Sequence, residues 1–534
     1  MKHLWWQTGV IYQIYPRSYQ DSNGDGIGDL KGILQRLDHL EQLGITAIWI
    51  SPIYPSPMAD FGYDISDYTG IHPLFGNMEY FDQLLAAVHQ RGMKLILDLV
   101  PNHTSDQHPW FLESRSSKDN PKRDWYIWHD AKADGSPPNN WLSVFGGSAW
   151  EWDAATGQYY YHAFLKEQPD LNWRNPQVQE AMMNVMRFWL DKGVDGFRVD
   201  VMWHMIKDDG LRDNPVNPHY EQHMATYEQL IPVYSTDQPE VHQLVKKMRQ
   251  VLDGYGERMM IGEIYLPIHK LVTYYGENNS GAHLPFNFML LSLHWQASQI
   301  AAAIDEYEGA LPEGGWPNWV LGNHDQPRIT SRVGVQQARV AAMLLLTLRG
   351  TPTIYYGDEI GMRDVAIPFE EVQDPQGLNM PDKNLSRDTA RTPMQWSSEA
   401  NAGFTTAKPW LRLDRAFERV NVQAQQDDPY SMLHLYRRLI NLRQREPSLM
   451  WGDYTPVFAD QQLLAYIRRA PGATAFLVVL NLSHRPAYFK PKGKPFSGTI
   501  VLATVPELEG TTVKDKIDLN GDEGVIVQLD EAAN

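Results

Sequence analysis

The sequence contains no cysteine, which excludes disulfide bonds and any thiol-based catalytic or metal site. Long apolar runs are also missing, and no stretch approaches the roughly 18 apolar residues that a membrane helix needs. The start, MKHLWWQTGVIYQIYPRS, has no continuous apolar core and no small-residue cleavage site, which argues against a signal peptide. These absences predict a soluble protein with no membrane partner and a cytoplasmic location.

Positive charge is scarce relative to negative charge. Lysine and arginine number 47 against 65 aspartates and glutamates, which gives a formal net charge of −18. Such a surface repels phosphate backbones and anionic lipids, so nucleic acid is not an expected partner. With 534 residues, 43% of them hydrophobic, the chain can build a large core. The 18 tryptophans and 26 tyrosines would suit the faces of sugars, although most such rings fill cores.

Short apolar runs alternate with amphipathic segments through most of the chain. The segments 30–44, 179–193, 337–350 and 432–449 have helical periodicity. The runs between such segments are nearly continuous and rich in β-branched residues, as in strands buried on both faces of a parallel sheet. They cover 9–16, 45–51, 93–100, 194–201, 258–265, 283–290, 318–325 and 351–358. Eight strands alternating with helices predict an α/β protein built on a (β/α)8 (TIM) barrel.

Three segments depart from this alternation. Residues 103–172 are rich in Trp, Tyr, Gly, Pro and Asn, and a connection of that length is typical of an inserted subdomain after the third strand. A second, polar insert covers about 362–428. After about residue 452, short strand-like pieces replace the helices and predict a C-terminal antiparallel β-sandwich. The expected domains are therefore a barrel (1–102 and 173–451), an insert (103–172) and a sandwich (452–534).

Residues 21–29 read DSNGDGIGD and resemble a cation-binding loop. Asp21, Asn23, Asp25 and Asp29 supply oxygen atoms, and three glycines let the backbone turn tightly. Calcium takes six to eight oxygen ligands. An EF-hand would need a glutamate at the twelfth position, where this chain has Gly32. The alternative is an acidic, glycine-rich turn without metal.

Polar residues cluster where the predicted strands end. The active sites of (β/α)8 barrels lie at the C-terminal ends of the strands. Any one of these residues has a simple structural explanation, such as a helix cap, but capping does not predict a cluster of acids, histidines and arginine from four strands. The cluster consists of Asn102, His103, Arg198, Asp200, Glu263, His324 and Asp325.

Three carboxylates without a nucleophilic Ser–His pair fit the cleavage of a glycosidic bond. One carboxylate attacks the anomeric carbon, and a protonated one gives its proton to the leaving oxygen. Arg198 precedes Asp200 by two residues on the same strand face and would hold it ionised. Glu263, between Ile261 and Ile264, is better placed to keep its proton as the acid.

These same residues carry a resemblance to the α-amylase family, glycoside hydrolase family 13. VPNH (100–103), GFRVD (196–200), GEIY (262–265) and NHD (323–325) resemble its four signature regions. The resemblance covers nearly the whole chain. QPDLNW (168–173), RTPMQW (391–396) and VIYQIYPRSY (10–19) resemble the oligo-1,6-glucosidase and α-glucosidase branch.

The resemblance implies a retaining double displacement on a small oligosaccharide substrate. Asp200 matches the nucleophile, Glu263 the general acid/base, and Asp325 the carboxylate that binds the sugar 2- and 3-hydroxyls. Asp60 and Arg391 resemble the pair that binds the 4-hydroxyl of the terminal sugar, so that one glucose is removed at a time. The other matching pocket residues are Tyr63, His103, Phe145, Phe164, Gln168, Arg198 and His324.

The resemblance also implies one structural Ca²⁺, held by Asp21, Asn23, Asp25, Asp29 and the Ile27 carbonyl. In this branch the residue after the nucleophile tracks the linkage, and Val201 favours α-1,6 bonds. The α-1,4-preferring maltases, sucrose-hydrolysing enzymes and sucrose or trehalose isomerases remain alternatives, although QPRITSRVG (326–334) resembles a plain hydrolase. Transglucosylation is expected as a side activity, and the chain is expected to be a monomer or weak homo-oligomer.

Two non-enzymatic alternatives are weaker. Non-catalytic transporter subunits related to this family have a membrane helix and lack catalytic carboxylates, whereas this chain has all three carboxylates and no apolar span. A carbohydrate-binding module would need the aromatic residues but not the acid/base pair.

Overall fold

Eight parallel strands form the centre of the computed structural model, which describes residues 3–491 and 495–530. Their order in the sheet is β10-β11-β1-β2-β3-β7-β8-β9, so the fold predicted from the sequence is confirmed as a nearly closed TIM barrel. The strands are β1 (Ile11–Ile14), β2 (Ala47–Ile50), β3 (Lys94–Leu99), β7 (Gly196–Val199), β8 (Met259–Gly262), β9 (Leu284–Pro285), β10 (Asn318–Val320) and β11 (Thr351–Tyr355).

The gap between β9 and β10 is bridged by a side chain. We expected a strand over 283–290, but it ends at Pro285, which has no N–H to continue a ladder, and Met289–Ser292 form helix α9. The Asn318 side chain donates to the Pro285 carbonyl and accepts from the Asn287 amide at 3.0 Å. One amide side chain thus supplies hydrogen bonds between these two strands.

Helices surround the barrel, and several begin at the cap residues that their sequences provide. Asn77, Asn175 and Ser431 accept backbone N–H groups at the starts of α4, α6 and α15. The helices of the outer layer are α2 (Leu30–Gln35), α3 (Leu37–Leu43), α4 (Met78–Gln90), α6 (Pro176–Asp191), α7 (Val241–Asp253), α8 (Ile268–Leu271), α10 (Ala297–Ala310), α11 (Ile329–Val333), α12 (Val335–Thr347), α15 (Met432–Arg445) and α16 (Pro447–Met450). The helices outside this layer include α1 (Trp5–Thr8), α5 (Pro109–Ser116), α13 (Pro375–Asn379) and α14 (Val422–Gln426).

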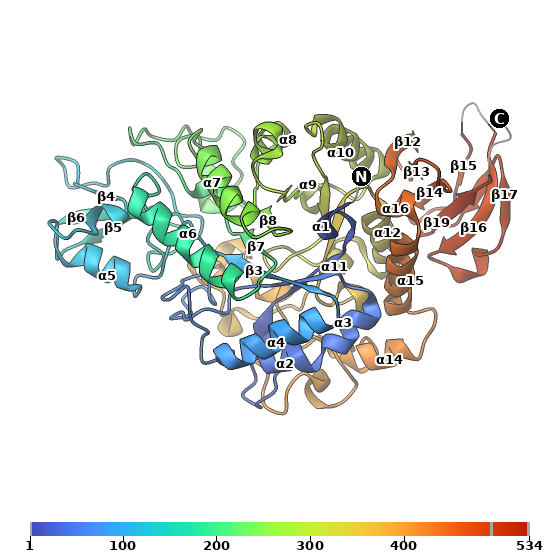
Figure 1. The fold of residues 1–534 in the computed structure, drawn as a ribbon, viewed down its shortest axis with the longest axis horizontal. Coiled ribbons are helices and arrows are strands. Elements are labelled where there is room, and N and C mark those ends of the chain that lie inside the picture. Colours follow the sequence, from blue (N-terminus) through green and yellow to red (C-terminus); the bar gives the residue numbers. More distant parts are fainter. Residues whose placement is uncertain (1–2, 492–494, 531–534) are drawn as a thin grey trace.

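The insert after β3 and the C-terminal sheets lie at opposite ends of the molecule (Figure 1). The insert contains α5 and a three-stranded antiparallel sheet of β4 (Trp128–His129), β6 (Gln158–Tyr161) and β5 (Trp150–Asp153). His103 pairs with Asp170 in an isolated β-bridge, so the chain enters and leaves the insert at one place.

The C-terminal strands form a six-stranded antiparallel sheet and a two-stranded one, which share an apolar core. They are β12 (Asp453–Ala459), β13 (Leu463–Arg469), β14 (Phe476–Asn481), β15 (Ala487–Phe489), β16 (Ser497–Ala503), β17 (Thr512–Lys514), β18 (Ile517–Leu519) and β19 (Gly524–Leu529). Within the described residues, no helix is both long enough and apolar enough to span a membrane.

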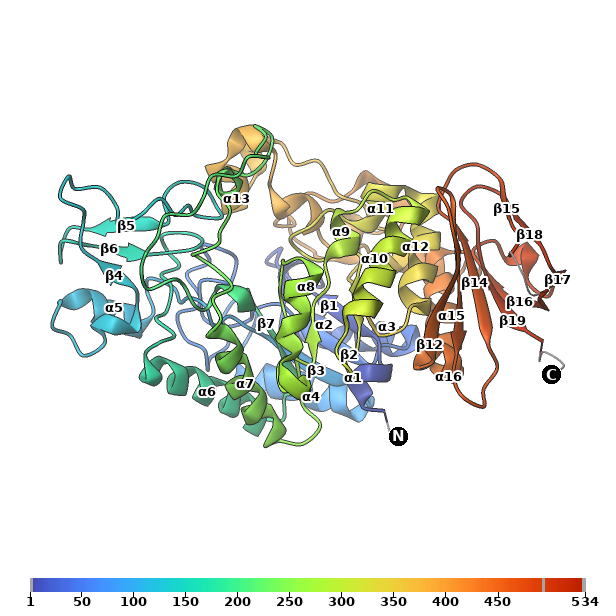
Figure 2. The same ribbon diagram turned by 90° about the horizontal axis from the view of Figure 1, so that it is seen from above.

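Two long segments lie over the C-terminal ends of the barrel strands, and the sequence analysis identified one of them. Residues 362–428 contain α13, α14 and several short 3₁₀ helices, as the polar composition predicted. Residues 203–240, which follow β7, contain only short 3₁₀ turns and were not recognised as a separate insert. Figure 2 shows the two segments meeting near α13. There the Thr226 hydroxyl contacts Met380 Sδ at 3.4 Å, and the Lys383 ammonium donates to the Gln222 carbonyl.

Candidate active site

A cavity of about 1050 Å³ opens at the C-terminal ends of the barrel strands. Its walls come from the barrel, the insert and both long segments. Three of the predicted carboxylates line it, namely Asp200, Glu263 and Asp325. The other predicted residues that line it are Asp60, Tyr63, His103, Phe145, Phe164, Gln168, Val201 and His324. The structure therefore brings together residues that are up to 265 positions apart in the chain.

Arg198 is the centre of a buried charge cluster. Its Nη1 donates to Asp98 Oδ1 at 2.9 Å and to Asp200 Oδ1 at 2.6 Å, and its Nη2 lies 2.7 Å from Glu263 Oε2. The sequence predicts that Arg198 contacts Asp200 and that Glu263 has apolar surroundings. Instead, Glu263 shares the same guanidinium and also accepts the Val201 backbone N–H at 2.8 Å.

Burial sets the protonation of this cluster. It raises the pKa of Asp200 well above its usual range and raises the pKa of Glu263, against the opposing effect of Arg198. Burial likewise raises the pKa of Asp98 to about 6. One guanidinium cannot neutralise three carboxylates, so burial favours a proton on this cluster.

Asp325 has a different electrostatic environment. Arg391 Nη2 lies 2.9 Å and Arg387 Nη1 3.2 Å from Asp325 Oδ1. Burial alone would raise the pKa of this carboxyl, but the guanidinium groups of Arg387 and Arg391 outweigh burial and lower it. Asp325 is therefore ionised, whereas the pKa values of the neighbouring Asp200 and Glu263 are raised.

Tyr63 and His324 form the floor of the cavity beside Arg198. Their rings are stacked, with centroids 5.4 Å apart and planes 4° apart. The Tyr63 hydroxyl lies 3.0 Å from Asp98 Oδ2 and 2.8 Å from His324 Nε2. Burial lowers the pKa of His324 well below its usual range, so this histidine is a neutral hydrogen-bonding group.

His103 and Gln168 connect the floor to the insert. Gln168 Nε2 lies 3.1 Å from His103 Nε2 and 3.3 Å from Asp60 Oδ2. Burial lowers the pKa of His103 to about 4, so it is also neutral at pH 7. Phe145 and Phe164 pack edge to face, with ring centroids 5.6 Å apart, and form an aromatic wall.

Asp60 forms its ion pair with an arginine other than the Arg391 that was predicted beside it. Arg387 Nη2 lies 2.7 Å from Asp60 Oδ1, and its guanidinium stacks over the Phe145 ring with 4.7 Å to the centroid. Arg391, the residue predicted for this role, instead donates from Nε to the His324 carbonyl at 2.7 Å and binds Asp325. The segment RDTAR contains two arginines four positions apart, and the motif RTPMQW had favoured the second.

Val201 lies in the left-handed backbone region, with φ 36°. This conformation is unusual for a β-branched residue and costs on the order of 1–3 kcal/mol, which the surrounding fold must offset. It directs the Val201 N–H to Glu263 and leaves the side chain on the cavity wall. A strained residue directly after Asp200 is typical of a functional site.

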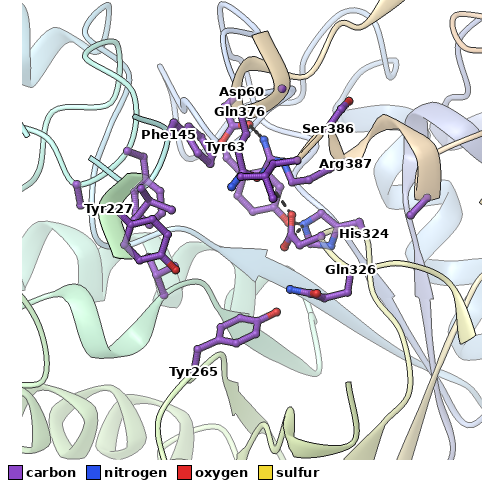
Figure 3. A pocket seen from close by; sticks show the side chains of 18 of the residues that line it. Asp60, Tyr63, Phe145, Tyr227, Tyr265, His324, Gln326, Gln376, Ser386 and Arg387 are labelled. Carbon is purple, nitrogen blue, oxygen red and sulfur yellow. Dashed lines mark hydrogen bonds and ion pairs between the residues drawn. The ribbon is translucent and has the colours of Figure 1, made fainter. Parts of the chain in front are cut away.

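The outer part of the cavity contains aromatic residues that the sequence analysis missed. Trp203 and Tyr227 come from the segment 203–240, whose role was not recognised, and Tyr265 follows Glu263 by two positions. In Figure 3, Tyr265 lies at the opposite end of the pocket from Asp60 and Arg387. The Tyr265 ring stacks on Phe288, with centroids 4.1 Å apart. The cavity thus has a charged inner end and an aromatic outer end.

The predicted calcium residues lie in a loop away from the cavity. The Asp21 carboxylate accepts the N–H groups of Asn23, Gly24 and Gly26 at 2.8–2.9 Å, and Asp25 Oδ1 accepts that of Ile27 at 2.9 Å. Asp29 caps α2. In the described part of the chain, no group of three or more His, Cys, Asp or Glu side chains is arranged to hold a metal ion. The oxygen donors suit calcium by type, since each carboxylate oxygen has further lone pairs.

Comparison with known proteins gives a consistent result. The family model "Alpha amylase, catalytic domain" matches residues 13–452. The chain is 44% identical over 508 residues to a probable alpha-glucosidase of Rhizobium meliloti (strain 1021), with 90% of each chain covered. It is 41% identical over 527 residues to an oligo-1,6-glucosidase of Parageobacillus thermoglucosidasius, with 92% of each covered.

Solved structures agree in fold over nearly the whole chain. The alpha-glucosyl transfer enzyme XgtA has a TM-score of 0.93 and 39% identity, covering 99% of this chain and 100% of that one. The trehalulose synthase MutB of Pseudomonas mesoacidophila MX-45 has a TM-score of 0.91 and 36% identity, with the same coverage.

A TIM barrel with clustered carboxylates, neutral histidines and aromatic walls at its strand ends defines a carbohydrate-processing enzyme. The comparisons narrow this class. The chain belongs to the α-amylase family, glycoside hydrolase family 13, as its motifs predicted, and it is a glycoside hydrolase that acts on oligosaccharides.

Proposed function

We propose that this enzyme is an α-glucosidase that removes single glucose units from the non-reducing end of short α-glucosides. The observation that carries the proposal is the ion pair between Asp60 and Arg387, 2.7 Å long, which lies beside Asp325 at the inner end of the cavity. A sugar chain cannot continue past a buried ion pair, so only a terminal residue fits beside the catalytic carboxylates. The alpha-glucosidase and oligo-1,6-glucosidase relatives support this substrate class.

The mechanism that we propose is a retaining double displacement. Asp200 attacks the anomeric carbon as its bond to the leaving oxygen breaks, and Glu263 gives its proton to that oxygen. Water then gives its proton to Glu263 and attacks the glucosyl–Asp200 ester, which releases glucose with its original configuration. Asp200 and Glu263 contact the two terminal nitrogens of the same guanidinium, at 2.6 and 2.7 Å. This closeness of the two carboxyl groups supports retention, because an inverting enzyme needs room for water between them.

The first step requires a particular starting state of the two carboxyl groups. The Asp200–Glu263 pair needs one proton in total, on Glu263, for the first step. Arg198 contacts both carboxyl groups and therefore stabilises whichever one is ionised. Asp325, ionised between His324 and two arginines, stabilises the positive charge that develops on the sugar.

We further propose a preference for α-1,6 linkages. Val201, held rigidly by its backbone bond to Glu263, presents a β-branched apolar side chain next to the nucleophile, where the leaving sugar lies. A single methyl group in place of a hydroxyl changes such a preference by only about 1–3 kcal/mol. An α-1,4-preferring maltase or sucrose-hydrolysing enzyme is the alternative.

Glucosyl transfer is a further proposed activity, because any hydroxyl that enters the outer cavity can replace water at the covalent intermediate. The structural similarity to XgtA and MutB supports it. Sucrose isomerisation would be a special case in which the released fructose is the acceptor.

The test is kcat/KM for isomaltose, maltose and sucrose measured in parallel, with all products followed by NMR. We expect isomaltose to be preferred and α-glucose to appear first. A preference for maltose or sucrose hydrolysis would refute the role of Val201 in linkage choice. Isomeric glucosyl-fructoses as main products from sucrose would show an isomerase.

We also propose that residues 21–29 bind one structural Ca²⁺ through Asp21, Asn23, Asp25, Asp29 and the Ile27 carbonyl. The loop lies against the segment 362–428, since the Thr405 hydroxyl bonds Asp21 and the Trp410 N–H donates to the Gly26 carbonyl at 3.0 Å. An ion there would stabilise this contact rather than take part in catalysis.

A further inference from the structure

Arg387 is held in the cavity mainly by a carboxylate that does not line it. Asp374 Oδ1 accepts from Arg387 Nη2 at 2.6 Å and from Nε at 2.9 Å, and Asp374 Oδ2 accepts the Arg387 backbone N–H at 2.8 Å. Asp60 and Asp325 each make one contact with the same guanidinium, at 2.7 and 3.2 Å. Three of these five contacts therefore come from Asp374, which is fully buried.

The position of Asp374 in its loop makes it a fixed support. Asp388 Oδ2 accepts the N–H groups of Gln373 and Asp374, at 2.7 and 3.0 Å. These bonds and the Asp374–Arg387 contacts join the two ends of the loop 375–386, whose residues Gln376, Gly377 and Ser386 line the cavity. The loop is closed at its base, and Arg387 projects from that base.

We propose that Asp374 is a positioning residue for recognition of the terminal sugar: it fixes the Arg387 guanidinium so that Arg387 and Asp60 together bind the 4-hydroxyl. This inference rests on the proposed function and assigns Asp374 a part in it. An arginine side chain has about 2 kcal/mol of rotamer entropy to lose, and a buried two-point contact at Nε and Nη2 removes that freedom before the sugar arrives. Nη1 and the outer edge of Nη2 are then left for Asp325, Asp60 and the ligand.

A comparison of two substrates reveals this role of Asp374 better than the rate on one substrate does. p-Nitrophenyl α-glucoside and its 4-deoxy analogue differ only in the hydroxyl that Arg387 and Asp60 are proposed to bind. A site built for a hydroxyl rejects the analogue that lacks it, by as much as about 10⁴-fold in kcat/KM. The ratio of the two kcat/KM values therefore measures how well that contact is made.

We expect Asp374→Asn to lower this ratio at least about tenfold, because a mobile Arg387 no longer distinguishes the two substrates well. Most of the loss should appear as a higher KM for the parent glucoside. Asp374→Glu, which keeps the charge, should recover part of the ratio. Asp414→Asn is the matched control, since Asp414 lies in the same segment and pairs with Arg363 at 3.3 Å outside the cavity.

The outcomes separate this inference from the proposed function. Equal losses on both substrates in Asp374→Asn, with the ratio unchanged, would show that Asp374 is only structural. If the ratio of the two kcat/KM values is near one in the wild-type enzyme, the 4-hydroxyl contact is not made. That result would overturn the inference without affecting the proposed α-glucosidase activity. A wild-type enzyme that cleaves neither glucoside would refute both. Circular dichroism and Tm measurements identify a variant that has failed to fold. If Asp374→Asn does not fold, the kcat/KM ratio of Asp374→Glu decides whether Asp374 positions Arg387.

Discussion

Asp98→Asn is the most informative single perturbation of the catalytic cluster. Asp98 is buried behind Arg198 and also accepts from Trp49 Nε1 at 3.2 Å and from the Tyr63 hydroxyl at 3.0 Å. An asparagine has the same shape and keeps one acceptor for Arg198. Its NH₂ group can donate to the Tyr63 oxygen but cannot accept from Trp49 Nε1, so the substitution removes a charge and one hydrogen bond of 3.2 Å while it keeps the contacts with Arg198 and Tyr63.

The size of the effect follows from the distances. Asp98 Oδ1 and Asp200 Oδ1 bond the same nitrogen at 2.9 and 2.6 Å, so they are close neighbours. At their greatest possible separation, about 5.5 Å, two unit charges repel by about 3 kcal/mol at an effective dielectric constant of about 20. That energy corresponds to about two pKa units. The negative charge of Asp98 raises the pKa of Asp200, so its removal lowers that pKa.

The assay is the pH dependence of kcat/KM with p-nitrophenyl α-glucoside. The acidic limb reports the ionised nucleophile and the alkaline limb the protonated acid. Both groups share Arg198, so Asp98→Asn should move the whole bell-shaped profile to lower pH, by about two units. A profile that keeps its position while its height falls would show that Asp98 acts through packing, and would refute this electrostatic reasoning.

Three further predictions follow from the same structure. Glu263→Gln should reduce kcat at least about 10³-fold and leave inhibitor binding within a few-fold, because the proton donor is lost; near-normal turnover would remove Glu263 from the acid role. Burial raises the pKa of Asp358 to about 7. This group therefore contributes stability below about pH 4 that is lost as the pH rises towards 7. The Tm of Asp358→Asn relative to wild type should consequently rise between pH 5 and pH 8, whereas parallel Tm curves would contradict the shift. Chelation of calcium should lower Tm and leave the kcat of the folded enzyme unchanged; an unchanged Tm would leave residues 21–29 as a metal-free turn.

The barrel strands and the position of the three cavity carboxylates could be predicted from the sequence for the same physical reason. Strands buried on both faces read as apolar runs, and the residue that follows such a run lies at the active end of the barrel. Asp200, Glu263 and Asp325 follow three such strands closely. The sixth strand was overestimated because an apolar composition does not reveal where Pro285 ends the ladder.

The parts of the site that could not be predicted depend on contacts between distant segments. Arg387 pairs with Asp60 across 327 residues, and two nearby arginines offered no local sign of which one lines the cavity. Asp98 lies in an apolar strand and gave no separate signal, although it shares Arg198 with both catalytic groups. The environment of Glu263 was misjudged because its neighbours in sequence are apolar while its neighbour in space is a guanidinium.

The central claim is that Asp200 forms a covalent bond to glucose, and trapping that intermediate tests it most directly. A 5-fluoro-α-glucosyl fluoride slows both steps while its good leaving group lets the first step proceed, so the ester should accumulate. We predict one fluoroglucosyl group per enzyme, located by mass spectrometry on the peptide that contains Asp200, and no label in Asp200→Asn. A label on another carboxylate, or turnover to β-glucose without a covalent species, would contradict the account.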